Sequence, residues 1–163
     1  MKRSRLLLAT VLISAAACAR TDTISGPVKT PGVAAAPVVR TIVGSPYTAN
    51  GSLWLRSDSG QFRLAGWPAT PLVDLIGAQV EVTGTDDPTH FFVVDRFTVL
   101  MVNGMPAADG ILETTTDGYG LRMLDGSMRG LVDPPEALLL CVGKRVWVAG
   151  PADAAPVAFG LLI

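Results

Sequence analysis

The segment Gln79-Val-Glu-Val-Thr-Gly84 decides the fold class, because its two valines alternate with polar residues and a glycine ends the run. An apolar residue at every second position is typical of a half-buried β-strand. The segment Arg145-Val-Trp-Val-Ala-Gly150 repeats the same valine spacing and the same final glycine. The two segments therefore predict one strand in each half of an all-β chain.

The residues on either side of these two segments also resemble each other. Six pairs fall into one order along the chain: Leu64/Leu124, Gly66/Gly126, Gly77/Gly143, Val80/Val146, Val82/Val148 and Gly84/Gly150. This register requires an insertion of about six residues within positions 127–135 of the second copy. Self-similarity of this kind predicts an internal duplication, so we expect the same set of elements in both halves.

Turn and helix signals divide each copy into short elements. The dipeptides Asn50-Gly51, Asp117-Gly118 and Asp125-Gly126 favour hairpin turns, because they tolerate positive φ. Pro71–Ile76 and Pro135–Val142 each begin with a proline and lead into a glycine, which is typical of a helix of one or two turns. We therefore expect one short helix between the strands of each copy.

The order of these elements resembles the small OB-like β-barrel domains of unknown function that occur in bacterial envelope proteins. The motifs that carry the resemblance in the first copy are Gly51-Ser-Leu53, Phe62-Arg-Leu64-Ala-Gly66, Leu72–Gly77 and Val80–Gly84. Two β-rich segments, Phe91–Leu100 and the shorter Val157–Ile163, would then close the copies. The resemblance implies two tandem OB-like small β-barrels, one at residues 38–104 and one at residues 105–163. It brings no catalytic residues and no cofactor.

The first residues, MKRSRLLLATVLISAAAC, have the basic start, apolar centre and small-residue end of a signal peptide at 1–17. Cys18 follows the small residues directly, which resembles a bacterial lipobox and implies that Cys18 is lipidated. Residues 18–37 are rich in Pro, Gly, Ala, Ser and Thr and predict a flexible tether. Because Ala19 follows the cysteine, analogy favours the outer membrane, facing the periplasm. Ala15 departs from the leucine of the lipobox, so a soluble periplasmic or secreted protein is the alternative.

The charge of the chain argues against nucleic acid as a partner. Removal of residues 1–17 leaves ten basic and 14 acidic residues, a formal charge of −4. The arginines of the remaining chain occur one at a time, and nucleic-acid binders carry a basic footprint with aromatic residues beside it. We therefore expect no nucleic acid among its partners.

The sequence offers little that points to an enzyme or a metal site. His90 is the single histidine, and no Gly-x-Ser-x-Gly motif accompanies it. Asp86, Asp87 and His90 supply too few ligands for structural zinc or for calcium, so we expect His90 in a turn and no metal. We predict no catalytic residues, no cofactor and no enzymatic activity.

Tryptophans and one cysteine are the remaining candidates. If Val146 and Val148 point inward, Trp147 points outward, where it either packs against the other copy or lines a binding face. Trp54, also in a predicted strand, is the second candidate for binding or for an interface, whereas Trp67 beside Pro68 is expected to fill a packing site. Cys141 lies in an apolar run and is expected in the core.

These observations favour a non-enzymatic envelope lipoprotein that binds a protein, a glycan or a small ligand at the membrane surface. The alternative is a structural protomer of an envelope assembly, with a hydrolase as the least favoured class.

Overall fold

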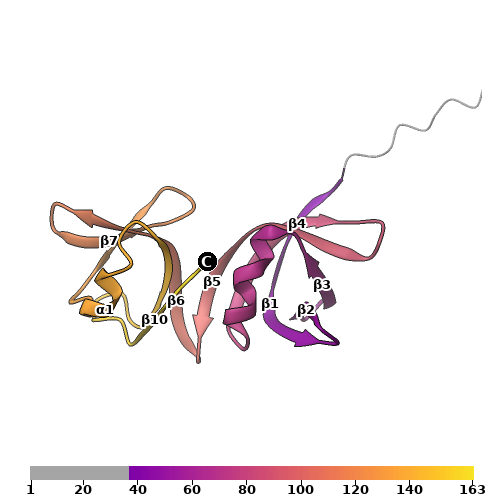
Figure 1. Cartoon of the computed structure of the whole chain (residues 1–163), viewed down its shortest axis with the longest axis horizontal. Coiled ribbons are helices and arrows are strands. Elements are labelled where there is room, and N and C mark those ends of the chain that lie inside the picture. Colours follow the sequence, from indigo (N-terminus) through magenta and orange to yellow (C-terminus); the bar gives the residue numbers. More distant parts are fainter. Residues whose placement is uncertain (1–36) are drawn as a thin grey trace, which may run out of the picture. The chain divides into compact units, whose positions relative to one another are not determined.

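Ten strands and two short helices follow one another in residues 37–163, the part of the chain that the computed structural model describes (Figure 1). The strands are β1 Val39–Ala49, β2 Ser52–Ser57, β3 Gly60–Ala65, β4 Gln79–Asp86, β5 Phe91–Val102, β6 Met105–Thr115, β7 Gly118–Arg122, β8 Met128–Leu131, β9 Arg145–Ala149 and β10 Ala158–Leu161. The helices are the 3₁₀ helix η1, Trp67–Leu75, and α1, Glu136–Leu139. The fold is mostly β, as the alternating segments predict.

The pairings of the first five strands run in a closed circuit. Strand β1 pairs with β2 and β4, and β2 pairs with β3. Strand β5 completes the circuit, because it pairs antiparallel with β4 and parallel with β3. Helix η1 connects β3 to β4 and buries Ala69, Leu72 and Leu75 against the strands.

The last five strands pair in the same order but do not close. Strand β6 pairs with β7 and β9, β7 pairs with β8, and β9 pairs with β10. Within residues 37–163 no pairing joins β8 to β10, which would correspond to the β3–β5 pair of the first half. The prediction of two tandem barrels is therefore not confirmed.

Positions with the same role in the two sets of strands lie 66 residues apart. Val39 begins β1 and Met105 begins β6, and both strands are 11 residues long. Gly44 pairs with Val80, and Gly110 pairs with Val146. Other identical residues at this spacing are Leu55/Leu121, Arg56/Arg122, Gly60/Gly126, Arg63/Arg129, Leu72/Leu138, Gly77/Gly143, Val82/Val148 and Gly84/Gly150.

This spacing corrects part of the register expected from the sequence. Gly126 lies in the turn between β7 and β8 with a positive φ, which is the place of Gly60 in the first half. Gly66 instead precedes η1, so the expected pairs Gly66/Gly126 and Leu64/Leu124 are wrong. No insertion is needed in the second half, because the mismatch came from a Leu-x-Gly triplet that happens to occur in both copies.

Gly110 shows why glycine is required in the first strand of each half. A Cβ built on Gly110 would lie 2.5 Å from the carbonyl oxygen of Arg122 in the neighbouring strand β7. Gly44 meets the carbonyl oxygen of Arg56 in the same way. Two strands approach each other most closely at these points, and only a residue without a Cβ fits there.

The two halves are joined covalently by the turn between β5 and β6. Asn103 and Gly104 form this turn with φ values of 50° and 76°, as in a type I′ hairpin. Only two residue pairs of β5 and β6 are in register, after which the strands separate. In Figure 1 these two strands stand side by side in the middle of the described region.

A buried ion pair bridges the strands where they have separated. The carboxylate of Asp109 on β6 accepts a hydrogen bond from the backbone N–H of Val99 on β5 at 2.7 Å. Its other oxygen accepts two from the guanidinium of Arg145 on β9, at 2.9 and 2.5 Å. The same guanidinium donates to the carbonyl oxygen of Phe97 at 2.6 Å and lies over the ring of Phe97. Asp109 and Arg145 of the second half thereby form hydrogen bonds with backbone groups of the first half.

Trp147 lies between the two core clusters of the molecule. Its neighbours Val146 and Val148 are buried in the cluster of the second half, whereas Trp147 packs against the cluster of the first half. Its indole also lies over Gly160 of β10, where a Cβ would be 2.5 Å from Nε1. Cys141 is partly buried and packs against the second cluster, where the apolar run predicts it.

The signal peptide, Cys18 and the tether up to residue 36 lie outside the described residues. Within residues 37–163, no helix has the length and apolar character needed to cross a membrane.

Candidate ligand-binding face

Four side chains stand in a row across the first half, one on each of four neighbouring strands. Tyr47 of β1 is paired with Trp54 of β2, Trp54 with Arg63 of β3, and Arg63 with Phe91 of β5. Paired residues on adjacent strands project from the same face of a sheet. The alternate residues of β2 and β3, such as Leu55 and Leu64, point into the core, so this row lies on the outer face.

The aromatic rings of Tyr47 and Trp54 lie next to each other and nearly parallel. Their centroids are 6.5 Å apart and their planes differ by 26°. The indole Nε1–H of Trp54 donates to the carbonyl oxygen of Ala49 at 3.3 Å, and the hydroxyl of Tyr47 donates to Oε1 of Gln61 at 2.8 Å. Both rings are therefore held in place before any ligand arrives.

Two arginines lie over rings of the same face. The guanidinium carbon of Arg63 is 4.4 Å from the ring centroid of Phe91, and its Nη2 donates to Oγ of Ser52 at 2.8 Å. The guanidinium carbon of Arg56 is 4.8 Å from the centroid of Tyr47. A cation over an aromatic face is attracted by the ring quadrupole, so each arginine is oriented by a ring.

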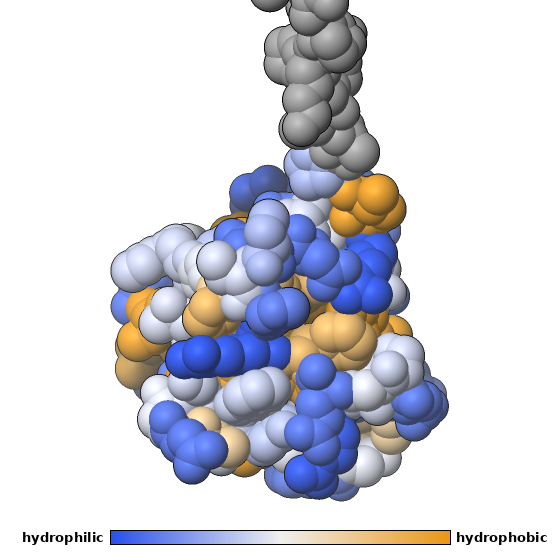
Figure 2. Space-filling view, turned by 90° about the vertical axis from the view of Figure 1, so that its right-hand side faces the viewer, coloured by the Kyte–Doolittle hydropathy of each residue, from blue (hydrophilic) through white to orange (hydrophobic). Residues whose placement is uncertain are grey.

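We call Tyr47, Trp54, Arg56, Arg63 and Phe91 the platform. The ion pairs among residues 37–163 are Arg40–Asp86, Arg122–Glu113 and Arg145–Asp109, so neither platform arginine is paired with a carboxylate there. Figure 2 views the molecule from the side of the first half and shows hydrophilic side chains lying beside and across an apolar patch. The face thus presents rings together with positive charge that no acid neutralises.

The matching face of the second half lacks the rings, and one of its two arginines is neutralised. At the spacing of 66 residues, Glu113 replaces Tyr47, Gly120 replaces Trp54 and Val157 replaces Phe91. Arg122 is retained, but its guanidinium is neutralised by Glu113 at 2.7 Å. This hydrogen-bonded arginine lowers the pKa of Glu113, and the carboxylate raises the pKa of Arg122.

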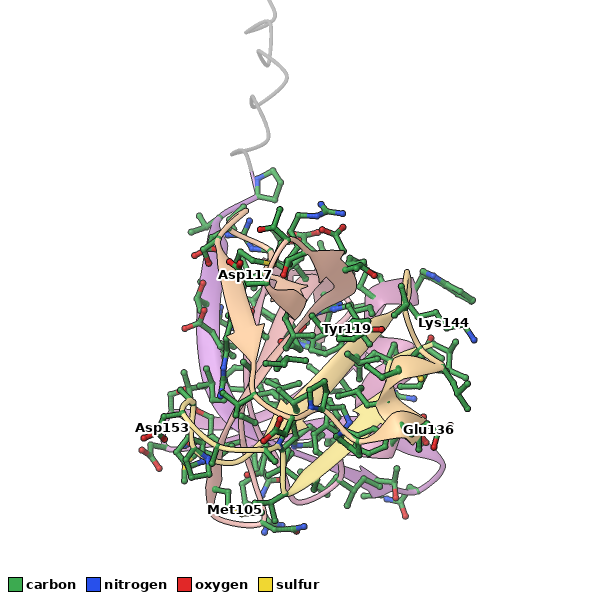
Figure 3. The ribbon with its side chains drawn as sticks, turned by 90° about the vertical axis from the view of Figure 1, so that its left-hand side faces the viewer. Met105, Asp117, Tyr119, Glu136, Lys144 and Asp153 are labelled. Atoms are coloured by element: carbon green, nitrogen blue, oxygen red, sulfur yellow. The ribbon has the colours of Figure 1, made fainter. Side chains whose placement is uncertain are left out.

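Figure 3 views the second half from its own side, with Met105 and Asp117 at opposite ends of the β6 region. Met128 covers Gly120 on this face, where a Cβ would be 2.9 Å from its sulfur. No aromatic residue occupies the positions that match Tyr47, Trp54 and Phe91.

The three tryptophans singled out by the sequence lie in three places. Trp54 is part of the platform, whereas Trp147 is packed between the halves and is absent from it. Trp67 is 84% exposed at the start of η1, so the expectation that it fills a packing site is wrong. The residues of η1 that pack against the strands are instead Ala69, Leu72 and Leu75.

Sequence reasoning missed Tyr47, Arg56, Arg63 and Phe91. The correct 66-residue register would have found three of them, because it shows that Tyr47 is replaced by Glu113 while the two arginines that follow are retained. Phe91 becomes visible only when the parallel pairing of β3 and β5 is known.

His90 and its neighbouring acids lie at the turn between β4 and β5. His90 has a φ of 67° in the turn between β4 and β5. Asp86 pairs with Arg40 at 2.5 Å, and the carboxylate of Asp87 accepts two hydrogen bonds from Thr89, which lower its pKa. Residues 37–163 contain no group of three or more His, Cys, Asp or Glu side chains able to hold a metal ion.

Comparisons with known proteins give one finding. No protein-family model and no curated protein sequence matches the chain. A solved structure of a deletion mutant of the single-stranded DNA binding protein from Thermus aquaticus aligns with 77% of this chain and 93% of its own, at 16% identity and a TM-score of 0.24.

The prediction that nucleic acid is not a partner is contradicted and is withdrawn. A solved structure that aligns with the chain is that of a single-stranded DNA binding protein. The premise of the prediction is also wrong, because Arg56 and Arg63 do not lie scattered but flank Tyr47, Trp54 and Phe91 on one face. Net charge and arginine spacing along the chain do not report how side chains gather on a sheet.

Proposed function

We propose that the folded part of this chain is a non-enzymatic binding module whose ligand lies across the platform of the first half. The observation that carries the proposal is the row Tyr47–Trp54–Arg63–Phe91, in which three rings and an arginine without an acidic partner stand side by side on four strands. Rigid aromatic side chains and arginines are the residues that contribute most to binding energy at recognition surfaces.

We also propose that residues 38–104 and 105–163 are two OB-like domains that arose by duplication. The strand-pairing order of each half and the identical residues 66 positions apart support this proposal. Barrels of this kind bind oligonucleotides and oligosaccharides over their second and third strands, which is where the platform lies, although a fold alone does not determine a function.

Backbone NMR of residues 37–163 tests the platform. We would titrate the protein with a neutral glucan oligomer, a polygalacturonate oligomer and an oligodeoxythymidylate, and follow the amide shifts of β1, β2 and β3. At least one probe is expected to shift these amides, and Trp54→Ala is expected to abolish that shift. Shifts confined to other elements, or none with any probe, would refute a binding role of this face.

We further propose that the module is held at the bacterial envelope by lipid on Cys18. Its basis is the residue order of positions 1–18, and a soluble periplasmic or secreted protein is the alternative. Intact mass of the protein from membrane fractions decides between them. A mass that begins at Cys18 and includes acyl chains, and that is lost in Cys18→Ala, supports the anchor, whereas an unmodified mass indicates the soluble form.

A second candidate function is assembly into a larger envelope structure. It is favoured by a shallow groove in which the exposed side chains of Trp67, Leu124 and Ile163 come together. Exposed apolar patches of this kind often mark interfaces between proteins. Sedimentation of the wild type and of Trp67→Ala over a range of concentrations tests it, because an assembly through this groove dissociates in the variant.

A further inference from the structure

The platform combines two chemical features that a ligand must match together. It carries three aromatic rings, and it carries two guanidinium groups that are already placed over two of those rings. Three strand spacings separate Tyr47 from Phe91, a distance of about 14 Å, so the row is long enough for more than one ring of a ligand. The ligand is therefore extended, bears negative charge and offers flat groups.

We propose that this ligand is single-stranded nucleic acid, bound with little sequence preference; the inference rests on the proposed function of the platform. Bases stack on aromatic side chains and on the planes of arginine guanidinium groups, and the phosphates lie beside the same cations. The half-buried ring of Trp54 and the two ring–guanidinium pairs supply these contacts.

The position of the two arginines over aromatic rings favours single-stranded nucleic acid over an acidic polysaccharide as the ligand. A uronate chain offers carboxylates to Arg56 and Arg63, but its sugar rings have no π-face to stack against a guanidinium. A polyanion that is recognised by charge alone would not need Trp54, whereas a base would stack on its ring. Double-stranded DNA keeps its bases inside the stack, out of reach of rings on a flat face.

The second half provides an internal comparison. It keeps Arg122 and Arg129 at the positions of Arg56 and Arg63 but has no ring to accompany them, and Glu113 neutralises Arg122. We therefore expect one binding face per chain. Arg122→Gln removes the same charge as Arg56→Gln on a face without rings, and it serves as the matched control.

Calorimetric titration of the mature chain with an oligodeoxythymidylate of about ten nucleotides, in the range that one such fold covers, tests the inference. If Arg56 and Arg63 each contact one phosphate, a plot of the logarithm of the association constant against the logarithm of the salt concentration has a slope of about −1.4. Arg56→Gln reduces the slope by about 0.7 in magnitude, and Arg122→Gln leaves it unchanged. Trp54→Ala weakens binding roughly tenfold, by loss of one stacked base.

A polygalacturonate of equal charge and a DNA duplex of equal length are the competing probes. If polygalacturonate binds as tightly as the oligonucleotide and Trp54→Ala has no effect, the face recognises charge alone and the inference is wrong. If polygalacturonate or neutral glucan binds through Trp54 and the oligonucleotide does not, the inference is wrong while the binding module remains. If no probe binds the platform, both are wrong. Thermal unfolding of Trp54→Ala confirms that the variant is folded.

Discussion

Arg56 and Arg122 occupy the same place in the two halves but have different partners. Arg56 lies over the ring of Tyr47, which leaves its charge available, whereas Arg122 is paired with the carboxylate of Glu113. One residue difference, tyrosine or glutamate, thus decides whether the neighbouring arginine is free to meet an anion.

The ion pair of Glu113 predicts a measurable shift in its titration. Because Arg122 lowers the pKa of Glu113, the carboxylate stays charged to a lower pH in the folded chain than in the unfolded chain. The contribution to stability is present above the ordinary glutamate pKa and is lost as the pH falls through the folded value. NMR titration is expected to give a pKa below the ordinary value of a glutamate side chain, and a return toward that ordinary value in Arg122→Gln. An equal pKa in both proteins would contradict the pairing.

Asp109→Asn is expected to destabilise the folded chain strongly. The side chain of Asp109 has no exposed surface, and its loss of charge leaves the guanidinium of Arg145 without its partner at the junction of the halves. Breaking a buried ion pair from one side costs about 3 kcal/mol or more. Urea unfolding measures the change, and Glu113→Gln on the surface is the control that should unfold almost as the wild type does.

At the scale of elements, strands β4 and β9 could be predicted because their valines alternate regularly and end at a glycine. Strand β1 could not be predicted, since Gly44 and Pro46 interrupt any alternation, and Gly110 interrupts the alternation of β6. Gly44 and Gly110 are required because a Cβ there would clash with the neighbouring strand, and a local sequence pattern does not show which strand is the neighbour. The platform was missed for the same reason, because it exists only across four paired strands.

Gly110→Ala is expected to disturb the pairing of β6 with β7. The new Cβ would collide with the carbonyl oxygen of Arg122, a backbone atom that cannot rotate away. Destabilisation by 1–3 kcal/mol, of about the size expected for overpacking, should appear in urea unfolding. Gly130→Ala in β8 is the control, since its Cβ would meet no atom within 4 Å. Equal stability of the two variants would show that β6 and β7 do not approach as described.

At the scale of the whole molecule, the two halves differ in where their distinctive side chains lie. The residues special to the first half, Tyr47, Trp54 and Phe91, form the outer platform. Those special to the second half, Asp109 and Trp147, contact the first half instead. The distinctive side chains of the first half thus lie on its outer face, and those of the second half lie at the junction between the halves.

Trp147→Ala tests the packing at this junction. The indole fills space between the first core cluster and Gly160, so its removal leaves a cavity at the junction. Loss of a large packed side chain costs about 3 kcal/mol. Thermal and urea unfolding are expected to show this loss, while Trp67→Ala, at a position 84% exposed, should show little. Unchanged stability of Trp147→Ala would mean that the halves do not depend on this contact.

Because the three tryptophans have different surroundings, their intrinsic fluorescence can report on different parts of the protein. Trp147 is partly buried between the halves, Trp67 is surrounded by solvent and Trp54 lies on the platform beside Tyr47. Among single-tryptophan variants, the one that keeps Trp67 would therefore emit at the longest wavelength. Quenching of Trp54 would follow ligand occupancy, and a red shift of Trp147 would follow separation of the halves, so the two events can be timed independently without any attached dye.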